Sequence, residues 1–557
     1  MTTDYRKQLE AKHTEYASLF DRMDTDRNLV NLVEYVLRDT DNKQIPHAIS
    51  VTLNDPLVFA VNVESSLGQS SEQITVESSD KKLDTTVVED FIKALFSEAD
   101  RILSRQGRWN LDPFFDQMNC RRGRSAARCV IKLEDDRLIP EITGWDTRFT
   151  DYIMDRQGLY AGRYKITRSR DAIQADYPDY VFEKEGTSFD VEDIWARDVN
   201  QIWVDSKLAL EQKNPFKSVP VAVQVVPMGS MMADADTMKY QGESIFFMIR
   251  DLIPELNRIA SIIQSLNTKA LDHALQLKVP IEDLPLKEVP LHDNVTKPNA
   301  VNPVPVGGGY DLMPLGQLQQ QAWLLHQMID TRIQRGGLNN FDTGTFSQPM
   351  SAVALVQVGE GRDQVFMPRL GSRGLLKEQL ARMGIEQTLM LCKAAGISTV
   401  RIGHQTYDIT KIEGEYEITF KYFIKSPKIE IARYSMAAAA GDLISNKTKR
   451  VDILQQEDPG GEERLLRSEE AERLSPRIKM FRTVKSLLED AEKGDDDARL
   501  EAQILASEFN ISIENVLKGN FEEPKPEETQ KPTQMIPLMD GNTGNTATKT
   551  VGSTQNG

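Results

Sequence analysis

The sequence has few of the features that mark a secreted or membrane protein. It contains three cysteines, Cys120, Cys129 and Cys392, in 557 residues. A small, odd number is typical of a reducing compartment, so we expect buried thiols and no disulfide framework. No run of about 18 apolar residues occurs, and the first residues, MTTDYRKQLEAKH, are too charged for a signal peptide. We therefore expect no membrane span and a cytosolic chain.

Short catalytic motifs are also absent. The sequence has no phosphate-binding G-x-x-x-x-G-K-[ST], no G-x-S-x-G, no H-E-x-x-H and no C-x-x-C. Histidine pairs at helical spacing would indicate a metal site, but the six histidines are scattered: His13, His47, His273, His292, His326 and His404. We predict no catalytic residue, no metal and no cofactor.

Charge and composition limit the remaining classes. The chain has 67 basic and 84 acidic residues, a net charge of −17, which opposes tight non-specific binding to nucleic acid. With 40% hydrophobic residues it has enough apolar material for several cores. At roughly 100 to 200 residues per domain, we expect about three to five compact units.

Hydrophobic periodicity predicts a helical N-terminal segment followed by an α+β domain. Apolar residues three or four apart predict helices over residues 1–40, including the run from Leu29 to Leu37, and over 83–106. From about residue 126 the pattern changes to short β-branched or aromatic segments bounded by Gly, Pro and Asp, which predict strands. These segments are 129–133, 159–168, 201–205 and 219–226.

One basic cluster lies in this domain. Residues 101–128 carry seven arginines against Asp112 and Asp116, and the densest part is a candidate basic strip: Arg121, Arg122, Arg124 and Arg128. Arginine forks bind phosphate bidentately, so the strip is a candidate phosphate contact. The alternative, which we favour because acidic residues are in surplus, is pairing with carboxylates of the same or an adjacent chain.

Two long helices of similar length flank a proline-rich segment. Apolar residues at alternating steps of three and four predict helices over 255–277 and 316–336, about 35 and 30 Å long at 1.5 Å per residue. Residues 278–315 between them hold seven of the 25 prolines, which favours an extended, mostly irregular segment with at most short strands. If the helices pair antiparallel, the two ends of this segment must meet. Two ordinary core helices remain the alternative.

The rest of the chain continues with a polar loop, a long helix and a return to strands. Residues 336–355 are rich in Gly, Asn and Thr, and a helical pattern then runs to Cys392, interrupted by breakers where kinks are expected: Gly359, Gly361, Pro368, Gly371 and Gly374. Alternation over 415–425 predicts a strand. Residues 431–518 read as charged helices, and 520–557 have the composition of a disordered tail.

This order of elements resembles the portal protein of tailed bacteriophages over nearly the whole chain. The segments NPFKSVPVAVQVVP and YQGESIFFMIRDLIPELNRIASIIQSL resemble the entry to the portal stem. The resemblance implies an α+β, portal-like subunit divided as follows: N-terminal helical segment 1–40, wing 41–238, first stem helix 239–277, clip 278–315, second stem helix 316–336, tunnel loop 337–350, long kinked helix 351–394, wing strand return 395–427, helical crown 428–519 and disordered tail 520–557.

The resemblance also implies function and partners. Portal proteins form a ring, typically of twelve subunits, at one capsid vertex of the virion, after assembly in the host cytoplasm. Double-stranded DNA enters and leaves through the ring. The implied partners are the terminase large subunit, a head-tail adaptor or tail protein, the major capsid protein and, as a further candidate, a scaffold protein.

Two sets of residues follow from the implied parts. The tunnel loop would contact DNA through short polar and aromatic groups, without reading sequence: Asn339, Asn340, Phe341, Thr343, Thr345, Phe346 and Gln348. Exposed charges on the clip would select partners, with mere solvation of the loop as an equal alternative for each of them: Glu282, Asp283, Lys287, Glu288, His292, Asp293 and Lys297.

A ring of twelve chains at −17 each would carry a charge of roughly −200, and we hypothesise that this field prevents tight phosphate contacts and lets DNA move. Two other classes remain open. One is another ring-forming tail or collar connector. The other is an α/β enzyme without a recognisable motif, which would need a deep pocket with converging titratable groups.

Overall fold

The computed structural model describes residues 4–46, 48–80, 83–271, 275–278, 309–312, 323–329, 331–332, 352–424, 433–434, 436–454, 456, 459–492 and 496–508. The chain divides into two compact units, Met1–Glu463 and Arg464–Gly557. The first unit contains both helices and strands, and the second contains helices in its described part. The predicted α+β class is confirmed.

A five-stranded sheet in the first unit has the order β13-β12-β3-β2-β9. Its strands are β2 (Arg124–Glu134), β3 (Arg137–Trp145), β9 (Val221–Val225), β12 (Thr399–Ile402) and β13 (Gln405–Asp408). Neighbouring strands are antiparallel except β12 and β3, which are parallel. Strands from residues 399–408 therefore join a sheet built mainly from residues 124–225.

A second five-stranded sheet is a meander in chain order: β4 (Thr150–Asp155), β5 (Gly158–Ser169), β6 (Ser188–Ala196), β7 (Val199–Val204) and β8 (Lys207–Lys213). Two-residue turns close hairpins in both sheets, with φ positive at both central residues: Asp135 and Asp136 between β2 and β3, and Asp205 and Ser206 between β7 and β8. Asp, Asn and Gly favour such turns, whose twist matches that of the strands. All four strand segments predicted in this region are confirmed.

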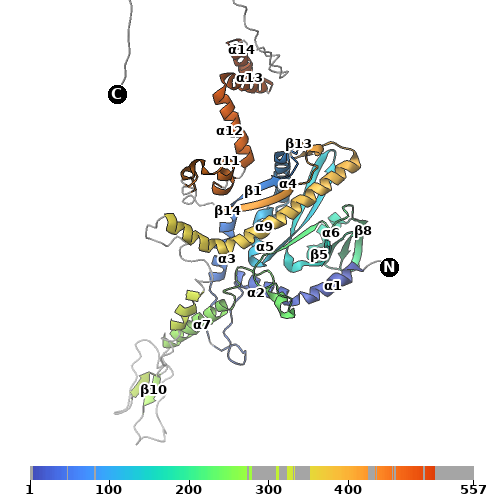
Figure 1. Cartoon of the computed structure of the whole chain (residues 1–557). Coiled ribbons are helices and arrows are strands. Elements are labelled where there is room, and N and C mark those ends of the chain that lie inside the picture. Colours follow the sequence, from blue (N-terminus) through green and yellow to red (C-terminus); the bar gives the residue numbers. More distant parts are fainter. Residues whose placement is uncertain are drawn as a thin grey trace, which may run out of the picture. The chain divides into compact units, whose positions relative to one another are not determined.

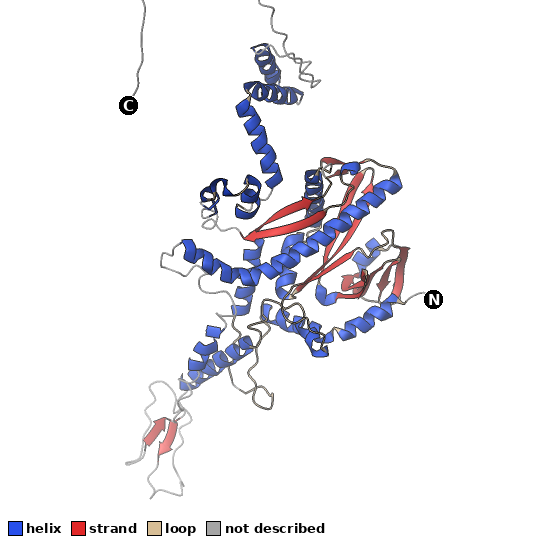
Figure 2. Cartoon of the chain, in the orientation of Figure 1, coloured by secondary structure: helices blue, strands red, loops and turns tan. Residues whose placement is uncertain are grey.

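A two-stranded antiparallel sheet joins β1 (Ser70–Glu77) to β14 (Glu417–Ile424), 340 residues apart in the chain, with Glu77 opposite Glu417. Helices α3 (Asp55–Gly68), α4 (Thr85–Arg105), α5 (Leu111–Arg121) and α9 (Ala352–Ala395) contribute to one large core with these strands. Figures 1 and 2 show α9 alongside the strands, and it contacts β14, β2 and β9.

Helix α9 is continuous through Pro368, where one backbone hydrogen bond is lost, and Figure 1 shows that the helix changes direction along its length. Helix α4 matches the helix predicted over 83–106 and is capped by the Asp84 side chain, which accepts a hydrogen bond from the Thr86 backbone N–H. All three cysteines are buried free thiols, as predicted.

The N-terminal prediction is partly wrong. Helices α1 (Tyr5–Glu15) and α2 (Ala17–Val30) form, but the helix expected through Leu37 ends at Val30. Leu32 adopts φ of +50°, and residues 33–37 after it are not helical. The apolar spacing of Leu29 to Leu37 imitates a helix, but the backbone N–H groups of Tyr35 and Leu37 donate to the hydroxyls of Thr52 and Ser50.

The first stem helix is also shorter than predicted. Helix α7 spans Leu252–Leu271, with Pro254 in its first turn. Residues 275–277, predicted to be the end of this helix, instead lie in β10 (Leu275–Lys278), which pairs antiparallel with β11 (Gly309–Leu312). In β10 the backbone groups pair with β11 in place of helical partners.

The smaller elements complete the description. In the first unit these are η1 (Thr147–Phe149), α6 (Arg170–Asp176), η2 (Ala235–Tyr240), η4 (Ile409–Lys411), η5 (Gly441–Leu443), α11 (Asn446–Thr448) and η6 (Lys449–Ile453). Helix α12 (Pro459–Leu474) begins there, and α13 (Pro476–Glu492) and α14 (Asp496–Glu508) lie in the second unit, where Val484 and Ala502 are buried together. None of the helices described has an apolar run that would cross a bilayer.

Candidate functional site

The two segments predicted as stem helices are in contact. Ile329, in the helical segment 323–329, is buried in one cluster with Leu256 and Ile259 of α7. Ile259 lies 16 residues before Leu275, and Ile329 lies 17 residues after Leu312, the residue opposite Leu275 in the β10–β11 pair. Nearly equal numbers of residues therefore separate the strand pair from the apolar contact on its two sides.

A polar ladder holds α7 against an extended part of the chain. The backbone N–H groups of Ile49, Val51 and Leu53 donate to Ser265 Oγ, Ser261 Oγ and Asn257 Oδ1, at 2.9, 2.8 and 3.0 Å. Two residues of a strand rise about 6.6 Å, and four residues of a helix rise about 6.0 Å, so alternate strand residues meet every fourth helix residue. Asn257 and Ser261 are buried.

The other side of the same extended segment also makes hydrogen bonds. Ser50 and Thr52 point away from α7 and accept from the backbone N–H groups of Leu37, at 3.1 Å, and Tyr35, at 2.8 Å. Residues 35–37, residues 49–53 and α7 thus form three layers joined by side-chain oxygens. Sequence analysis missed this arrangement. Two features of the sequence could have indicated it. Asn257, Ser261 and Ser265 recur at every fourth position of α7, and Ser50 and Thr52 alternate along the extended segment.

A buried charge cluster fixes the start of α7. Arg250 donates to Asp26 of α2 at 2.6 Å and to Glu243 at 2.6 Å, and Arg22 of α2 lies 3.1 Å from Glu243. Burial lowers the pKa of Arg22 to about 10. Burial also opposes the charged form of Arg250, but the hydrogen bonds from Arg250 to Asp26 and Glu243 raise its pKa. Two cations and two anions balance, so the cluster ties α2 to the chain before α7.

A second buried cluster anchors α9. Arg373 donates to Asp116 of α5 at 2.6 Å, and Lys377 donates to Glu72 of β1 and to Asp112 at 3.1 Å. Burial raises the pKa of Asp116 to about 7, outweighing the attraction of Arg373. Both α9 cations also lie over aromatic rings, Arg373 at 4.1 Å from the ring centroid of Tyr422 and Lys377 over the ring of Phe96.

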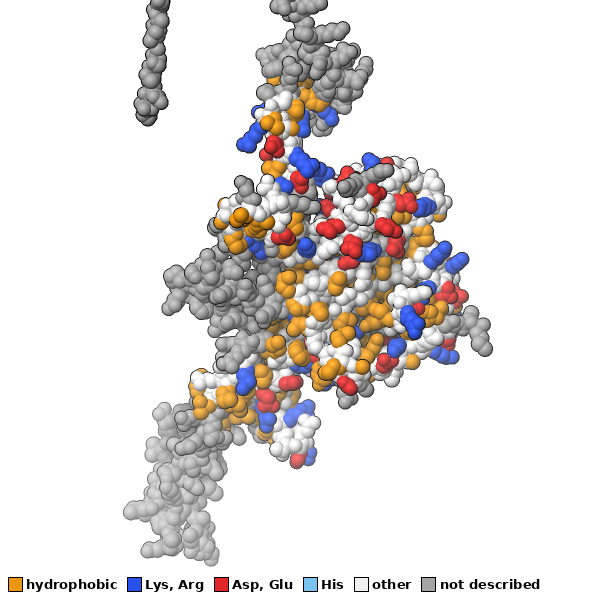
Figure 3. Space-filling model, in the orientation of Figure 1, with side chains coloured by type: hydrophobic (Ala, Val, Ile, Leu, Met, Phe, Trp, Pro, Cys, Tyr) orange, Lys and Arg blue, Asp and Glu red, His pale blue; other side chains and the backbone are white. Residues whose placement is uncertain are grey.

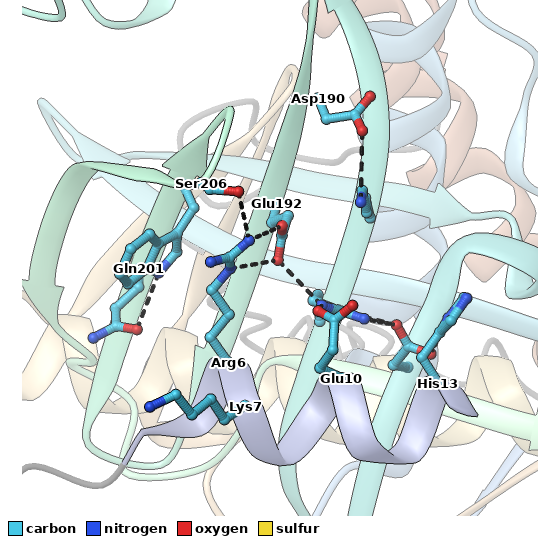
Figure 4. A network of polar contacts seen from close by, with 12 residues as sticks. Arg6, Lys7, Glu10, His13, Asp190, Glu192, Gln201 and Ser206 are labelled. Carbon is cyan, nitrogen blue, oxygen red and sulfur yellow. Dashed lines mark hydrogen bonds and ion pairs between the residues drawn. The ribbon is translucent and has the colours of Figure 1, made fainter. Parts of the chain in front are cut away.

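A third network fastens α1 to the β4–β8 sheet (Figure 4). Buried Arg163 of β5 donates to Asp151 at 2.7 Å, to Glu192 at 3.2 Å and to Glu10 of α1 at 2.9 Å. Arg6 of α1 also donates to Glu192, at 2.9 Å. The hydrogen bond from Arg163 lowers the pKa of Glu10. Ion pairs therefore connect the N-terminal helix to three strands.

The four arginines of the candidate basic strip do not form a strip on the surface. Three pair with carboxylates inside the chain: Arg121 with Glu64 at 2.7 Å, Arg122 with Asp146 at 3.1 Å, and Arg128 with Asp193 at 2.8 Å. The fourth, Arg124, is buried and donates to Tyr152 Oη at 2.9 Å. The three ion pairs of Arg121, Arg122 and Arg128 are of the kind expected under the alternative to phosphate binding.

Large apolar side chains remain exposed on the helical segment 323–329. Trp323, Leu324, Leu325 and Met328 are between 47 and 59% exposed, while Ile329 is buried against α7. Figure 3 shows hydrophobic side chains on the surface around α7, while acidic side chains gather over the C-terminal part of α9. Large apolar side chains that are exposed together on one helix are commonly covered by a partner. This surface is therefore a candidate interface.

The other predicted site residues belong to the clip and tunnel-loop segments of the prediction. All seven clip residues, Glu282, Asp283, Lys287, Glu288, His292, Asp293 and Lys297, lie outside the described residues. The same holds for the tunnel-loop set: Asn339, Asn340, Phe341, Thr343, Thr345, Phe346 and Gln348. Their roles stay predictions.

Within the part of the chain that the structure describes, no group of three or more His, Cys, Asp or Glu side chains is arranged to hold a metal ion. One open cavity of about 510 Å³ lies at the end of the β1–β14 pair, lined by Glu77, Ser78, Ser79, Glu415, Tyr416 and Glu417. Its lining holds three carboxylates, one tyrosine and two serines.

Comparison with known proteins gives similarities to solved structures, two of which are described here. No protein-family model and no curated protein sequence matches the chain. The structure is similar to a chain in the neck of an empty gene transfer agent (GTA) particle, at 11% identity and a TM-score of 0.35, over 71% of this chain and 88% of that chain. It is also similar to a chain in the virion of the native gene transfer agent particle, at 9% identity and a TM-score of 0.34, over the same shares of both chains.

Proposed function

We propose that the chain is a portal subunit, which forms a ring at one capsid vertex and provides the channel for double-stranded DNA during packaging and ejection. The observation that carries the proposal is the return of the chain at β10–β11. Lys278 pairs with Gly309, and nearly equal numbers of residues separate this strand pair from the contact of Ile259 with Ile329 on its two sides. This supports a two-helix stalk from which residues 279–308 leave and to which they come back.

The contacts around α7 support the same role. A stalk that transmits load between partners at its tip and the body of a ring must not pivot. The ladder from Ile49 to Leu53 braces α7 along its length, and the cluster of Arg250 with Asp26 and Glu243 anchors its start. These side chains resist both tilting and sliding of α7.

The ring would consist of about twelve copies, with the apolar surface of 323–328 covered by a neighbour. The terminase large subunit and a tail adaptor would dock at residues 278–315, and the major capsid protein would surround the ring. The chain itself would hydrolyse no nucleotide, because the motor would supply that reaction. Residues 337–350 would line the channel and contact DNA without reading its sequence.

Deletion of residues 339–347 tests the channel assignment. We expect rings of unchanged mass that package or retain less DNA in an assembly reaction with capsids and motor. A matched control deletes an equally long part of residues 540–557 and should package normally. Loss of the ring on deletion of 339–347 would contradict the assignment, since it would make the loop an assembly element.

Charge replacement at the tip tests the docking assignment. Changing Glu282, Asp283, Glu288 and Asp293 to the corresponding amides should weaken binding of the motor or adaptor while ring mass stays constant. The control is the same kind of substitution, Glu to Gln, at the exposed residues Glu211 and Glu413 of the first unit. Unaltered binding of both partners would contradict docking at this segment.

A further inference from the structure

Among the described residues, two of the buried arginines have no carboxylate partner, unlike the other buried arginines. Six arginines are buried in this part of the chain: Arg22, Arg122, Arg124, Arg163, Arg369 and Arg373. Four of them lie within 4.0 Å of a carboxylate. In the part of the chain that the structure describes, Arg124 and Arg369 have no carboxylate within that distance.

The hydrogen bonds of these two side chains all go to uncharged groups. Arg124 donates to Tyr152 Oη at 2.9 Å and, at a long 3.4 Å, to the backbone oxygen and Oε1 of Gln241. Arg369 donates to the backbone oxygen of Val365 and to Met228 Sδ, the latter at 3.4 Å. Burial lowers the pKa of Arg369, in line with a cation that no anion stabilises.

One loop covers both arginines. Met228 and Gln241 lie at the two ends of the loop 226–241, where Gly229 and Gln241 form an antiparallel bridge and the Ser230 N–H donates to Tyr240 O at 3.0 Å. Residues bridged in this way have Cα atoms about 5 Å apart. The residues that touch Arg124 and Arg369 are therefore neighbours, and both guanidinium groups donate hydrogen bonds to residues at the base of the same loop.

An uncompensated buried cation is costly to the folded chain. A buried charge without an opposite partner destabilises a protein strongly, and proteins normally pair it or neutralise it. An arginine does not lose its proton at ordinary pH, so it cannot be neutralised in that way. The nearby Arg22 and Arg250 show the usual solution, because Asp26 and Glu243 balance them. Among the described residues, no such anion lies beside Arg124 or Arg369.

We propose that Arg124 and Arg369 form a binding site for a carboxylate from a second copy of this chain, which enters when the loop 226–241 moves. The inference rests on the proposed ring, which brings two unlike surfaces of neighbouring copies together. The chain has 84 acidic against 67 basic residues, so carboxylates are plentiful on a neighbour. The loop tip offers a first contact, because Met231 and Met232 are 74 and 63% exposed and methionine adapts to varied surfaces.

The first experiment compares Arg369→Met with Arg121→Met in the unassembled full chain, in chloride buffer at fixed ionic strength. Arg121 is the matched control because its guanidinium has a carboxylate partner, Glu64. Thermal unfolding should show Arg369→Met at or above the wild-type temperature and Arg121→Met below it. A fall for Arg369→Met as large as that for Arg121→Met, or failure of Arg369→Met to fold, would overturn the proposal.

The second experiment measures assembly against protein concentration by mass photometry. The protein concentration at which half of the chain is assembled should be at least about tenfold higher for Arg369→Met and for Arg124→Met than for wild type. Arg369→Lys keeps the positive charge, so its half-assembly concentration should lie between that of wild type and that of the methionine variants. Assembly of both methionine variants at the wild-type concentration would overturn the site. If wild-type chain forms no ring at all, the proposed function fails, which is a different outcome.

A third arm separates a protein carboxylate from a free oxyanion. We add inorganic phosphate to the unassembled wild-type chain at constant ionic strength and measure its unfolding temperature. The rise caused by phosphate should be smaller than the rise caused by assembly. If phosphate stabilises wild type but not Arg369→Met, and both assemble alike, the site takes a free oxyanion and the second-copy proposal is wrong.

Discussion

The backbone N–H of Val51 donates to Ser261 Oγ at 2.8 Å, across 210 residues of chain. This bond is the centre of the ladder that braces α7, and the Ser261 side chain is buried. We predict that Ser261→Ala destabilises the first unit by about 1–3 kcal/mol, because the N–H of Val51 loses its acceptor. Urea unfolding measures the change. Thr268→Ala, whose hydroxyl bonds its own helix, is the control and should change stability by less than about 0.5 kcal/mol. Equal effects of the two variants would contradict the brace.

The stalk contact makes a separate prediction. Ile329→Ala should raise amide hydrogen exchange in α7, because Leu256 and Ile259 lose the side chain that covers them, a loss of about 2 kcal/mol or more for a buried isoleucine. Met328→Ala is the matched control, since the neighbouring Met328 is 59% exposed in the single chain. Faster exchange in both variants, or in neither, would contradict the pairing of the two helices.

The network around Arg163 predicts a large effect from a single change. Arg163→Met leaves Asp151 and Glu192 as buried, mutually repelling carboxylates, and removal of one partner from such a buried pair costs about 3–5 kcal/mol. Lys165→Met, two residues along the same strand, removes an exposed cation 3.5 Å from Asp190 and should cost less than about 1 kcal/mol. Thermal unfolding distinguishes them. A small effect at Arg163 would contradict a charge-balancing role for its guanidinium between Asp151 and Glu192.

Asp116 gives a pH prediction with a definite sign. Burial raises its folded-state pKa to about 7 from a usual value of 3.8, so the folded chain binds more protons than the unfolded chain between these values. Its contribution to stability is therefore complete below pH 3.8 and falls as pH rises to about 7, by up to about 1.4 kcal/mol per pH unit.

The variant Asp116→Asn should lose this slope, because an amide does not titrate. We subtract the unfolding free energy of Asp116→Asn from that of the wild type at each pH. This difference should shrink between about pH 4 and pH 7, and stay level above about pH 8, where the carboxyl is ionised in both states. A difference independent of pH would contradict the raised pKa.

Local sequence patterns predicted the elements whose stability depends on near neighbours. Helix α4 and strands β2, β5, β7 and β9 follow from apolar period and turn residues. The arrangement of residues 49–53 could not be predicted in this way, because their hydrogen-bond partners lie on α7, more than 200 residues away in the chain. Apolar residues three or four positions apart led to a helix prediction for Leu29 to Leu37, which is not helical beyond Val30. The same spacing led to the prediction that the helix of α7 continues through residues 275–277, which lie in β10.

The buried ion pairs show the same limit. Arg121, Arg122 and Arg128 form a conspicuous basic cluster in the sequence, yet each meets a carboxylate between 24 and 65 positions away. The pair of Arg373 and Asp116 spans 257 positions. One sequence carries no signal for such distant pairs, so a basic run resembles a phosphate-binding surface until the fold supplies its partners.

The mass of the assembled protein tests the central claim most directly. Native mass spectrometry of purified full-length chain should give one closed species of about twelve times 62.9 kDa, with a central channel visible by electron microscopy. A monomer or dimer at concentrations up to the limit of solubility would contradict the portal account.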